Sequence, residues 1–433
     1  MRPTLETMRF LTASLFLLSL LPVAAQTAPV MTLHDLKEAD TLGVELYTNS
    51  GATGLVLVVV RGNQVYFHGY GEAVPGSQVA PTPNSVVRLC SLTKIFTSDL
   101  LSKLVFDRTV HLDDALKKWA PADAVVPEKD APITLEDLAT HTAGLEREIG
   151  TAPRRTPHFS YPDYETRWHW LASATLKSTP GTKAFYSNVG FDLLSDALAE
   201  AAHTPYSTLL ETRTLKPLGM WDTTFYPNPR LCERLMAGAH EEGPCTITAS
   251  TEGSSGLYST PADMEKFLSY LVGAGAPALP VQAEDARRVY LLPSSLKGQY
   301  GLDHAGRESG IGLGWMHLGA DGEVSHIIEK TGGGAGFTTY IAIHPASHTA
   351  VFVAATEGPK HAWTPGFNLF KATNNGLLAL AGLPPLPDRP TRRVAKTHGL
   401  RAAGKVHSRR PAKRRHAMRV SQPSVAHSPS STR

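Results

Sequence analysis

Several classes of protein are excluded by what this sequence does not contain. Beyond residue 25, none of its 433 residues lies in a run apolar enough to cross a bilayer, which takes about 20 apolar residues in succession. No His or Cys cluster has the spacing of a metal site. The glycine run at 332–336 lacks the G-K-[ST] ending of a phosphate-binding loop and precedes a predicted strand, whereas such a loop precedes a helix. We therefore expect no metal ion, no cofactor and no bound nucleotide.

An apolar run does occur at the N-terminus. Arg2 and Arg9 precede the apolar segment 10–21, which is short for a membrane span, and 23–25 supplies the small residues that a signal peptidase reads. This pattern predicts that residues 1–25 form a signal peptide that is removed on export to the periplasm. An uncleaved membrane anchor is the alternative. No cysteine lies near the cleavage site, so we do not expect a lipoprotein.

Cysteine is scarce, and export gives its three residues a context. Cys232 and Cys245 flank a short polar loop and are candidates for a disulfide in an oxidising compartment. Two unpaired thiols are the alternative. Cys90 lies in an apolar stretch, so we interpret it as a small buried hydrophobic residue and not as a nucleophile.

Charge is distributed unevenly along the chain. Hydrophobic residues make up 42% and charged residues 19%, which is enough apolar material for a sizeable core. The segment 388–433 holds 13 Lys and Arg residues against one Asp, although the whole chain has a net charge of only +3. Few large apolar residues occur there, so we predict a folded domain at 26–385 and a disordered basic tail at 386–433. The positive charge of the tail predicts electrostatic attraction to anionic envelope surfaces. We expect no specific nucleic-acid partner.

The hydrophobic pattern predicts an α+β fold. Two β-rich hairpins are expected, one at 54–74 around a Gly-Asn turn and one at 338–357. The simplest assembly joins them in one antiparallel sheet that is flanked by helices, with a helical lobe inserted between the two hairpins. An active site is then expected where the lobe meets the sheet. The segments with a helical pattern are 134–142, 166–177, 189–202, 206–220, 261–272 and 367–381.

A predicted helix at 88–101 carries unusual chemistry for an apolar segment. Its leucine, isoleucine and phenylalanine residues recur at a helical period, yet Ser91 and Lys94 lie one turn apart on another face. A serine hydroxyl is a weak nucleophile that needs a neighbouring base. A lysine that is buried, or that lies near another cation, has a lowered pKa and can take that proton. Taken alone, this pair also fits a capping serine and a solvated lysine.

Two further motifs follow it in the chain. Tyr186 and Asn188 form Y-x-N at the start of a predicted helix, and Lys330, Thr331 and Gly332 form K-T-G before the second hairpin. S-x-x-K, Y-x-N and K-T-G in this order resemble the serine β-lactamase and penicillin-binding-protein superfamily, and Y-x-N is typical of its class C branch.

The resemblance extends beyond these motifs into the framework. It runs from about residue 51 to about 382 and includes the segments 133–145, 216–225 and 256–268. The sequence looks most like the AmpH-type D-alanyl-D-alanine carboxypeptidase/endopeptidases. The basic tail departs from that type.

The resemblance implies a role for each motif residue. Ser91 is the nucleophile and Lys94 the close base. The phenol of Tyr186 lies between Ser91 and the two motif lysines, where neighbouring cations favour its ionised form. Whether Lys94 or Tyr186 takes the serine proton stays open. Asn188 orients Lys94 and the substrate amide.

The K-T-G segment is implied to bind substrate. Lys330 and Thr331 hold a substrate carboxylate. Gly332 and Gly333 are expected to let an acyl group approach the strand closely, because a side chain there would obstruct it. The backbone N–H groups of Ser91 and Gly333 form the oxyanion hole by the same resemblance.

The sequence is therefore interpreted as that of a periplasmic serine peptidase. It is expected to act on peptidoglycan stem peptides through an acyl-enzyme on Ser91, and to be acylated by β-lactams at the same serine. A class C-like β-lactamase and a serine esterase of the same fold are the enzymatic alternatives. The intact K-T-G, which suits a carboxylate-bearing substrate, argues against the esterase. A non-catalytic binding homologue is the alternative from another class.

Overall fold

The computed structural model describes residues 37–240, 243–274, 280–302, 305–319, 323–359 and 362–386. The predicted signal peptide and almost all of the predicted tail lie outside the described residues. A seven-stranded antiparallel sheet has the order β2-β1-β11-β10-β9-β8-β7. Its strands are β1 (Gly54–Arg61), β2 (Gln64–Gly71), β7 (Glu308–Ile311), β8 (Met316–Leu318), β9 (Ile327–Gly334), β10 (Phe337–His344) and β11 (Thr349–Thr356).

Both predicted hairpins are confirmed. Strands β1 and β2 are joined by two residues and close on the pair Arg61 and Gln64, with Gly62 supplying the positive φ of 57° that the turn needs. Strands β10 and β11 reverse through a short turn in which His348 has a φ of 49°. Strand β1 then pairs with β11, so the two ends of the domain meet in the middle of the sheet as predicted.

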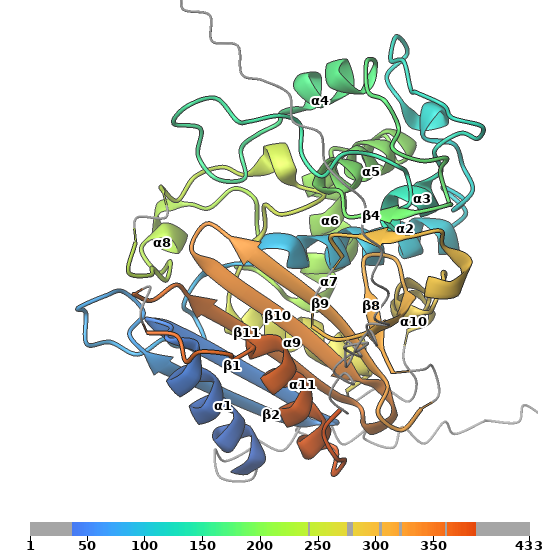
Figure 1. The fold of residues 1–433 in the computed structure, drawn as a ribbon. Helices are drawn as coiled ribbons and strands as arrows, with labels where there is room; N and C mark the ends of the chain where they lie inside the picture. Colours follow the sequence, from blue (N-terminus) through green and yellow to red (C-terminus); the bar gives the residue numbers. More distant parts are fainter. Residues whose placement is uncertain are drawn as a thin grey trace, which may run out of the picture. The chain divides into compact units, whose positions relative to one another are not determined.

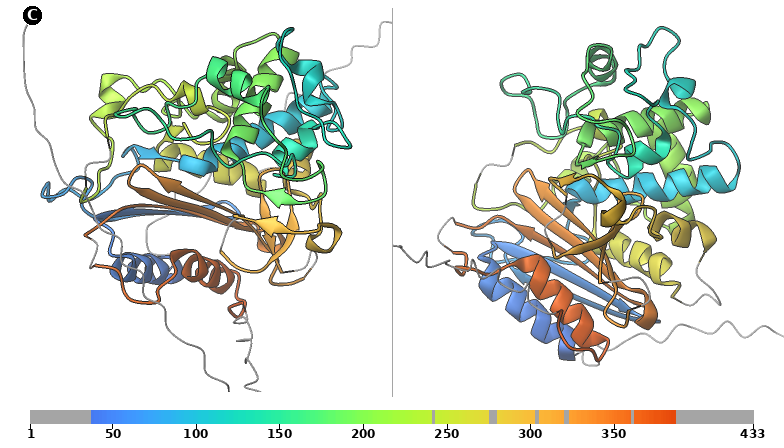
Figure 2. Two further views of the ribbon diagram at one scale, coloured as in Figure 1. Left: turned by 45° about the horizontal axis from the view of Figure 1, so that its top comes forward. Right: turned by 45° about the vertical axis from the view of Figure 1, so that its right-hand side comes forward.

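Helices cover both faces of the sheet (Figures 1 and 2). Helices α1 (Lys37–Ser50) and α11 (Leu369–Leu380) lie side by side on one face, and the turn before α2 (Thr93–Phe106) together with α9 (Pro261–Val272) packs on the other. Alternate residues of β1 therefore enter two separate cores, one on each face. This double burial explains why β1 is an uninterrupted apolar run.

A helical lobe is inserted between β2 and β7, as the sequence predicts (Figure 2). The predicted helix at 206–220 is interrupted by a π-helical turn, Glu211–Leu215, and ends at Gly219 in the left-handed region. The helix predicted from 166 ends at Leu171, well short of 177. Sequence reasoning missed α1, α10, β7 and β8. The remaining helices are α3 (Leu135–Ala139), α4 (Tyr164–Leu171), α5 (Asn188–Ala201), α6 (Tyr206–Leu210), α7 (Lys216–Leu218), α8 (Pro229–Cys232) and α10 (Val281–Arg287).

Two short ladders place the motif segments within the lobe. Strand β3 (Val87–Arg88) pairs with β5 (Tyr258–Ser259) directly before Ser91. Strand β4 (Ala184–Phe185) pairs in parallel with β6 (Gln299–Tyr300) directly before Tyr186. Each two-residue ladder therefore fixes the backbone from which one of the predicted site residues projects.

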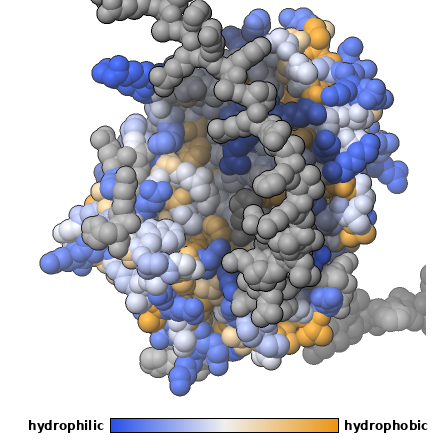
Figure 3. All heavy atoms as spheres, in the orientation of Figure 1, coloured by the Kyte–Doolittle hydropathy of each residue, from blue (hydrophilic) through white to orange (hydrophobic). Residues whose placement is uncertain are grey.

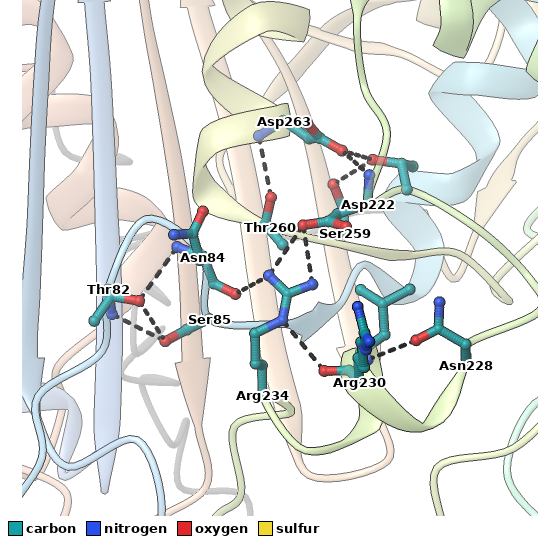
Figure 4. A network of polar contacts seen from close by, with 12 residues as sticks. Thr82, Asn84, Ser85, Asp222, Asn228, Arg230, Arg234, Ser259, Thr260 and Asp263 are labelled. Atoms are coloured by element: carbon teal, nitrogen blue, oxygen red, sulfur yellow. Dashed lines mark hydrogen bonds and ion pairs between the residues drawn. The ribbon is translucent and has the colours of Figure 1, made fainter.

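A polar network braces the approach to β3 (Figure 4). Both terminal nitrogens of Arg234 donate to Asp222 Oδ2 at 3.0 Å, and one of them also donates to the carbonyl of Asn84. The Asp222 N–H in turn donates to Asp263 Oδ2 at 2.8 Å, and the Thr223 hydroxyl does so at 3.0 Å. These bonds connect the segment before β3 to the start of α9, which holds β3 and the turn after it in place.

The predicted disulfide is present in the structure. Cys232 and Cys245 are joined by a disulfide, and Cys90 is a buried cysteine that takes no part in it. On the face shown in Figure 3, the apolar residues that the structure describes form small scattered groups and not one large patch. None of the helices in the described ranges combines the length and apolar character that a membrane span requires.

Candidate active site

Ser91 lies at the centre of a 3₁₀ turn, Cys90–Leu92, that leads directly into α2. The predicted start of this helix at residue 88 is wrong, because Arg88 belongs to β3. Cys90 has a φ of 53°, a left-handed conformation that is uncommon for a residue with a side chain and often occurs at functional sites. This tight reversal turns the chain from strand to helix and places Ser91 at the head of α2.

Lys94 is fully buried one turn beyond Ser91. Its Nζ donates to Asn188 Oδ1 at 2.6 Å and to the Ser254 carbonyl at 2.9 Å, and lies 3.5 Å from Ser91 Oγ. A neutral amine has two protons and one lone pair, so it can satisfy both acceptors and still accept a proton from Ser91. The geometry is therefore compatible with Lys94 acting as a base as well as with a charged Lys94.

The environment of Lys94 favours the neutral amine. Burial, which is the largest effect, lowers its pKa, and the nearby Lys330 lowers it further, while Tyr186 and Asp192 act in the opposite direction. Besides its three hydrogen-bonding groups, two aromatic rings lie close to the amine: the ring centroids of Tyr186 and Phe191 are 4.9 and 5.5 Å from Lys94 Nζ. A lysine in this setting meets the chemical requirement stated above for a proton acceptor.

Tyr186 is surrounded by positive charge. The distances from its ring centroid are 4.9 Å to Lys94 Nζ, 5.3 Å to Lys330 Nζ and 4.5 Å to the Arg147 guanidinium carbon. The imidazole of His141 stacks on the same ring with centroids 4.5 Å apart. The structure thus brings the ring of Tyr186 close to both motif lysines.

His141 supports Tyr186 as a neutral ring. Burial is the main reason why its pKa is well below the usual value, and Lys94, Lys330 and Arg147 lower it further. Its Nδ1 accepts a hydrogen bond from the Ser187 N–H at 3.2 Å, which fixes the backbone next to Tyr186. This contact agrees with a bracing role for His141.

The K-T-G motif lies on β9 beside the nucleophile turn. Lys330 is fully buried, and its Nζ donates to the Thr331 carbonyl at 3.0 Å. A Cβ added to Gly332 would come within 2.2 Å of Thr339 Oγ1 and 2.8 Å of the Leu89 carbonyl. The expected reason for this glycine is therefore corrected: it lets β9 pack against the protein's own backbone before Ser91.

Gly333 has a different environment from its neighbour. A Cβ added there would meet no atom closer than the Phe337 carbonyl at 3.9 Å. The residue is exposed, so the space beside it is open to an incoming acyl group. The expectation of close approach by a substrate therefore fits Gly333 and not Gly332.

Sequence reasoning missed several polar contacts around these residues. The Arg147 carbonyl accepts the Asn188 N–H at 2.9 Å, and Glu148 accepts a hydrogen bond from the Asn188 side chain. Ser254 supplies the carbonyl that holds Lys94. Charged residues directly after the buried stretch 138–145 were the available signal for Arg147 and Glu148, whereas nothing local marks a backbone carbonyl at Ser254.

Other features of the described residues do not coincide with this site. A surface cavity of about 540 Å³ lies along α6, α7 and residues 220–226, and none of the predicted site residues lines it. Within the described ranges, no group of three or more His, Cys, Asp or Glu side chains is arranged to hold a metal ion.

A group of buried charged side chains lies in the lobe near Lys94. Arg167 forms a two-pronged ion pair with Asp196, both bonds being 2.6 Å long, and Trp168 also donates to Asp196. Burial raises the pKa of Asp192 to about 7 and that of Glu252 to about 8. This part of the lobe therefore contains more acidic groups than cations to match them.

Replacing Glu252 with glutamine is expected to make stability less dependent on pH. Because the folded state raises the pKa of Glu252 from 4.5 to about 8, folding binds a proton between these values, and wild-type stability falls as the pH rises through this window. The variant has no carboxylate to ionise, so it should gain on the order of 4 kcal/mol relative to wild type between pH 5 and pH 9, about 1.4 kcal/mol for each pH unit up to the folded pKa of about 8. Thermal unfolding at both values measures the difference.

Glu165→Gln is the matched control, because Glu165 is an exposed glutamate of the same lobe. Its pH dependence should follow that of the wild type. Equal slopes for wild type and Glu252→Gln would contradict the prediction.

Comparisons with known proteins agree with this geometry. The profile of the beta-lactamase family matches residues 39–364. The D-alanyl-D-alanine-carboxypeptidase/endopeptidase AmpH of Escherichia coli K12 is 41% identical over 348 residues, which cover 80% of this chain and 90% of that protein. A crystal structure of a beta-lactamase/D-alanine carboxypeptidase from Yersinia pestis, complexed with citrate, is 38% identical, covers 79% of this chain and 97% of its own, and superposes with a TM-score of 0.75.

A more distant structure shares the fold. The class C beta lactamase of Rhodobacter sphaeroides is 21% identical, covers 80% of this chain and 98% of its own, and superposes with a TM-score of 0.60. The predicted β-lactamase-like fold and the predicted superfamily are thus confirmed. From the matched profile and the two close relatives, we conclude that this chain belongs to the beta-lactamase family.

Proposed function

We propose that this protein is a serine D-alanyl-D-alanine carboxypeptidase/endopeptidase that acts on peptidoglycan stem peptides through an acyl-enzyme on Ser91. The observation that carries the proposal is the Ser91–Lys94–Asn188 constellation, in a chain that is 41% identical to an AmpH carboxypeptidase/endopeptidase over most of both lengths. The surrounding framework matches as well, which favours the activity of that relative over the activity of more distant members of the family.

Acylation requires the loss of one proton from Ser91. We assign the acceptance of this proton to Lys94 or Tyr186. The proton is transferred as Ser91 Oγ attacks the carbonyl carbon of the penultimate D-alanine. The N–H groups of Ser91 and Gly333 are assigned to the developing oxyanion. The C–N bond then breaks, and the amine of the terminal D-alanine takes up the proton and leaves. The stem peptide remains as an ester on Ser91.

Deacylation repeats these steps with water as the nucleophile. A base removes a proton from the water as its oxygen bonds to the ester carbonyl. The bond to Ser91 Oγ breaks, and the serine recovers its proton from the same base. A β-lactam follows the first half of this sequence, and its acyl-enzyme persists if the second half is slow.

We assign the terminal carboxylate of the substrate to Lys330 and Thr331. Lys330→Ala should reduce kcat/KM for a peptide with a free terminal carboxylate about 10- to 100-fold, because a charge-assisted hydrogen bond contributes about 1.5–3 kcal/mol. The same substitution should affect an uncharged ester less. Steady-state kinetics on the peptide and on an uncharged ester measure this difference. Lys216→Ala, on the surface of α7, is the control variant. Equal losses on the charged and uncharged substrates would refute the assignment.

One experiment tests the function itself. Residues 26–387 are incubated with purified muropeptides and, in parallel, with a chromogenic cephalosporin. Release of D-alanine or cleavage of cross-linked dimers, with slow turnover of the cephalosporin, is the expected result. Fast cephalosporin turnover without muropeptide cleavage would instead assign the chain as a β-lactamase. No turnover of either substrate would indicate a binding homologue.

The proposal includes export to the periplasm with cleavage after residue 25. It is supported by the charged and apolar pattern of residues 1–25 and by a disulfide within the folded domain. The basic tail, 386–433, is assigned to electrostatic attraction to anionic envelope surfaces and not to catalysis.

A further inference from the structure

We propose that Asp192 is a positioning residue whose buried carboxylate, acting through Ser254, sets the charge of Lys94 and thereby the pH range over which Ser91 is acylated. This inference rests on the proposed acyl transfer at Ser91. It adds a residue that none of the three motifs contains.

The contacts connect Asp192 to Lys94 from two directions. Asp192 lies one helical turn after Asn188 on α5, so both side chains are on the same face of that helix. Asn188 holds Lys94 Nζ directly at 2.6 Å. The Ser254 hydroxyl donates to Asp192 Oδ2 at 3.1 Å, and the Ser254 carbonyl accepts from Lys94 Nζ at 2.9 Å. Ser254 is therefore bonded to both the acid and the amine.

The Asp192 carboxylate has fewer hydrogen bonds than we expect for a buried acid with a purely structural role. Asp192 is only 1% exposed, and its Oδ1 has no hydrogen-bond partner among the described residues. Buried polar atoms are normally paired, and leaving one unpaired destabilises the fold. A serine-bonded asparagine would hold the same position without a buried charge. The presence of an acid here is explained if its charge acts on a neighbour.

Two cations, Arg167 and Lys94, lie close enough to act on the charge of this acid. The charged groups around Asp192 are Lys94 on α2, Arg167 on α4, Asp196 on α5 itself and Glu252 after the turn 249–251. Arg167 is already engaged by both oxygens of Asp196. Burial raises the pKa of Asp192 to about 7, whereas Arg167 and Lys94 act to lower it. The acid lies close to the amine, so the charges of the two groups are coupled.

The direction of the effect follows from the sign of the charge. An ionised Asp192 raises the pKa of Lys94, against the effect of burial. Removing that negative charge lets the amine lose its proton at a lower pH. The same direction applies to any proton-accepting group in the site, because a nearby anion always favours the protonated form.

The test compares Asp192→Asn and Asp192→Glu with wild type in the full-length chain. The rate constant for acylation of Ser91 by a fluorescent penicillin is measured from pH 4.5 to pH 9. These rate constants form a pH–rate profile whose acidic limb is the part where the rate rises as the pH increases. For Asp192→Asn, the midpoint of this acidic limb should move down by about 0.5–1 pH unit. For Asp192→Glu, which keeps the charge, it should stay near the wild-type position. Asp263→Asn removes a buried carboxylate from the network of Figure 4 and should leave the limb unchanged.

Each outcome decides the proposal. An unchanged limb in Asp192→Asn, or equal shifts in Asp192→Asn and Asp192→Glu, would overturn it and leave Asp192 a packing residue. If Asp192→Asn does not fold, Ser254→Ala replaces it: loss of the hydroxyl disfavours the ionised acid, so the limb should move in the same direction. An unmoved limb in that variant would also overturn the proposal. Wild-type protein that is not labelled at Ser91 would refute the proposed function itself, which separates the two failures.

Discussion

Replacing Ser91 with alanine is expected to abolish covalent labelling by penicillin and to reduce peptidase turnover by roughly 10³-fold or more. The hydroxyl is the group that we expect to form the acyl bond. Ser91 is 8% exposed, and the change removes one oxygen atom, so the protein should remain folded. Labelling is measured by intact-protein mass spectrometry and peptide mapping, and folding by thermal unfolding.

Ser102→Ala is the matched control for this experiment. Ser102 is a buried serine on α2, about three helical turns beyond Ser91, so its replacement tests the effect of losing a buried serine from this helix. The Ser102→Ala variant should be labelled by penicillin to the same extent as the wild type. Labelling of Ser91→Ala that maps to a different residue would refute the nucleophile assignment.

Removing the hydroxyl of Tyr186 is expected to slow peptidase turnover about 10²- to 10⁴-fold, which is the contribution of a general base. The ring is retained in Tyr186→Phe, so its stacking on His141 and its contacts with the surrounding cations are retained too. Lys94 lies on the nucleophile's own helix, whereas Tyr186 comes from a separate segment after β4. We therefore expect the phenol to activate water on the other side of the ester.

The two half-reactions distinguish the roles of this phenol. If Tyr186 serves deacylation more than acylation, Tyr186→Phe will still take up penicillin on Ser91 and will hold it longer than wild type. The decay of the acyl-enzyme, followed by intact-protein mass spectrometry, measures this. Phe185→Leu, which changes the adjacent ring without touching a hydroxyl, is the control. Wild-type turnover of muropeptides by Tyr186→Phe would make the phenol structural and assign the base to Lys94.

The sequence by itself determined the features that depend on neighbours in the chain. The two hairpins follow from short turns between β-rich runs, and Ser91 and Lys94 meet because residues three apart share a helical face. The order and spacing of the three motifs also predicted the family, since each motif is a local pattern. The strands β7 and β8 were missed because they are short and follow no clear alternation.

Only the tertiary structure determined which groups contact one another in the site. Lys94 is held by Asn188 and by the Ser254 carbonyl, at separations of 94 and 160 residues, and a backbone carbonyl has no sequence signature. The same is true of the cations around Tyr186 and of the Leu89 backbone that requires a glycine at 332. These contacts depend on how the lobe packs on the sheet. Packing is a property of the whole fold, so the pKa of Lys94 and the part played by Asp192 could not be read from a local pattern.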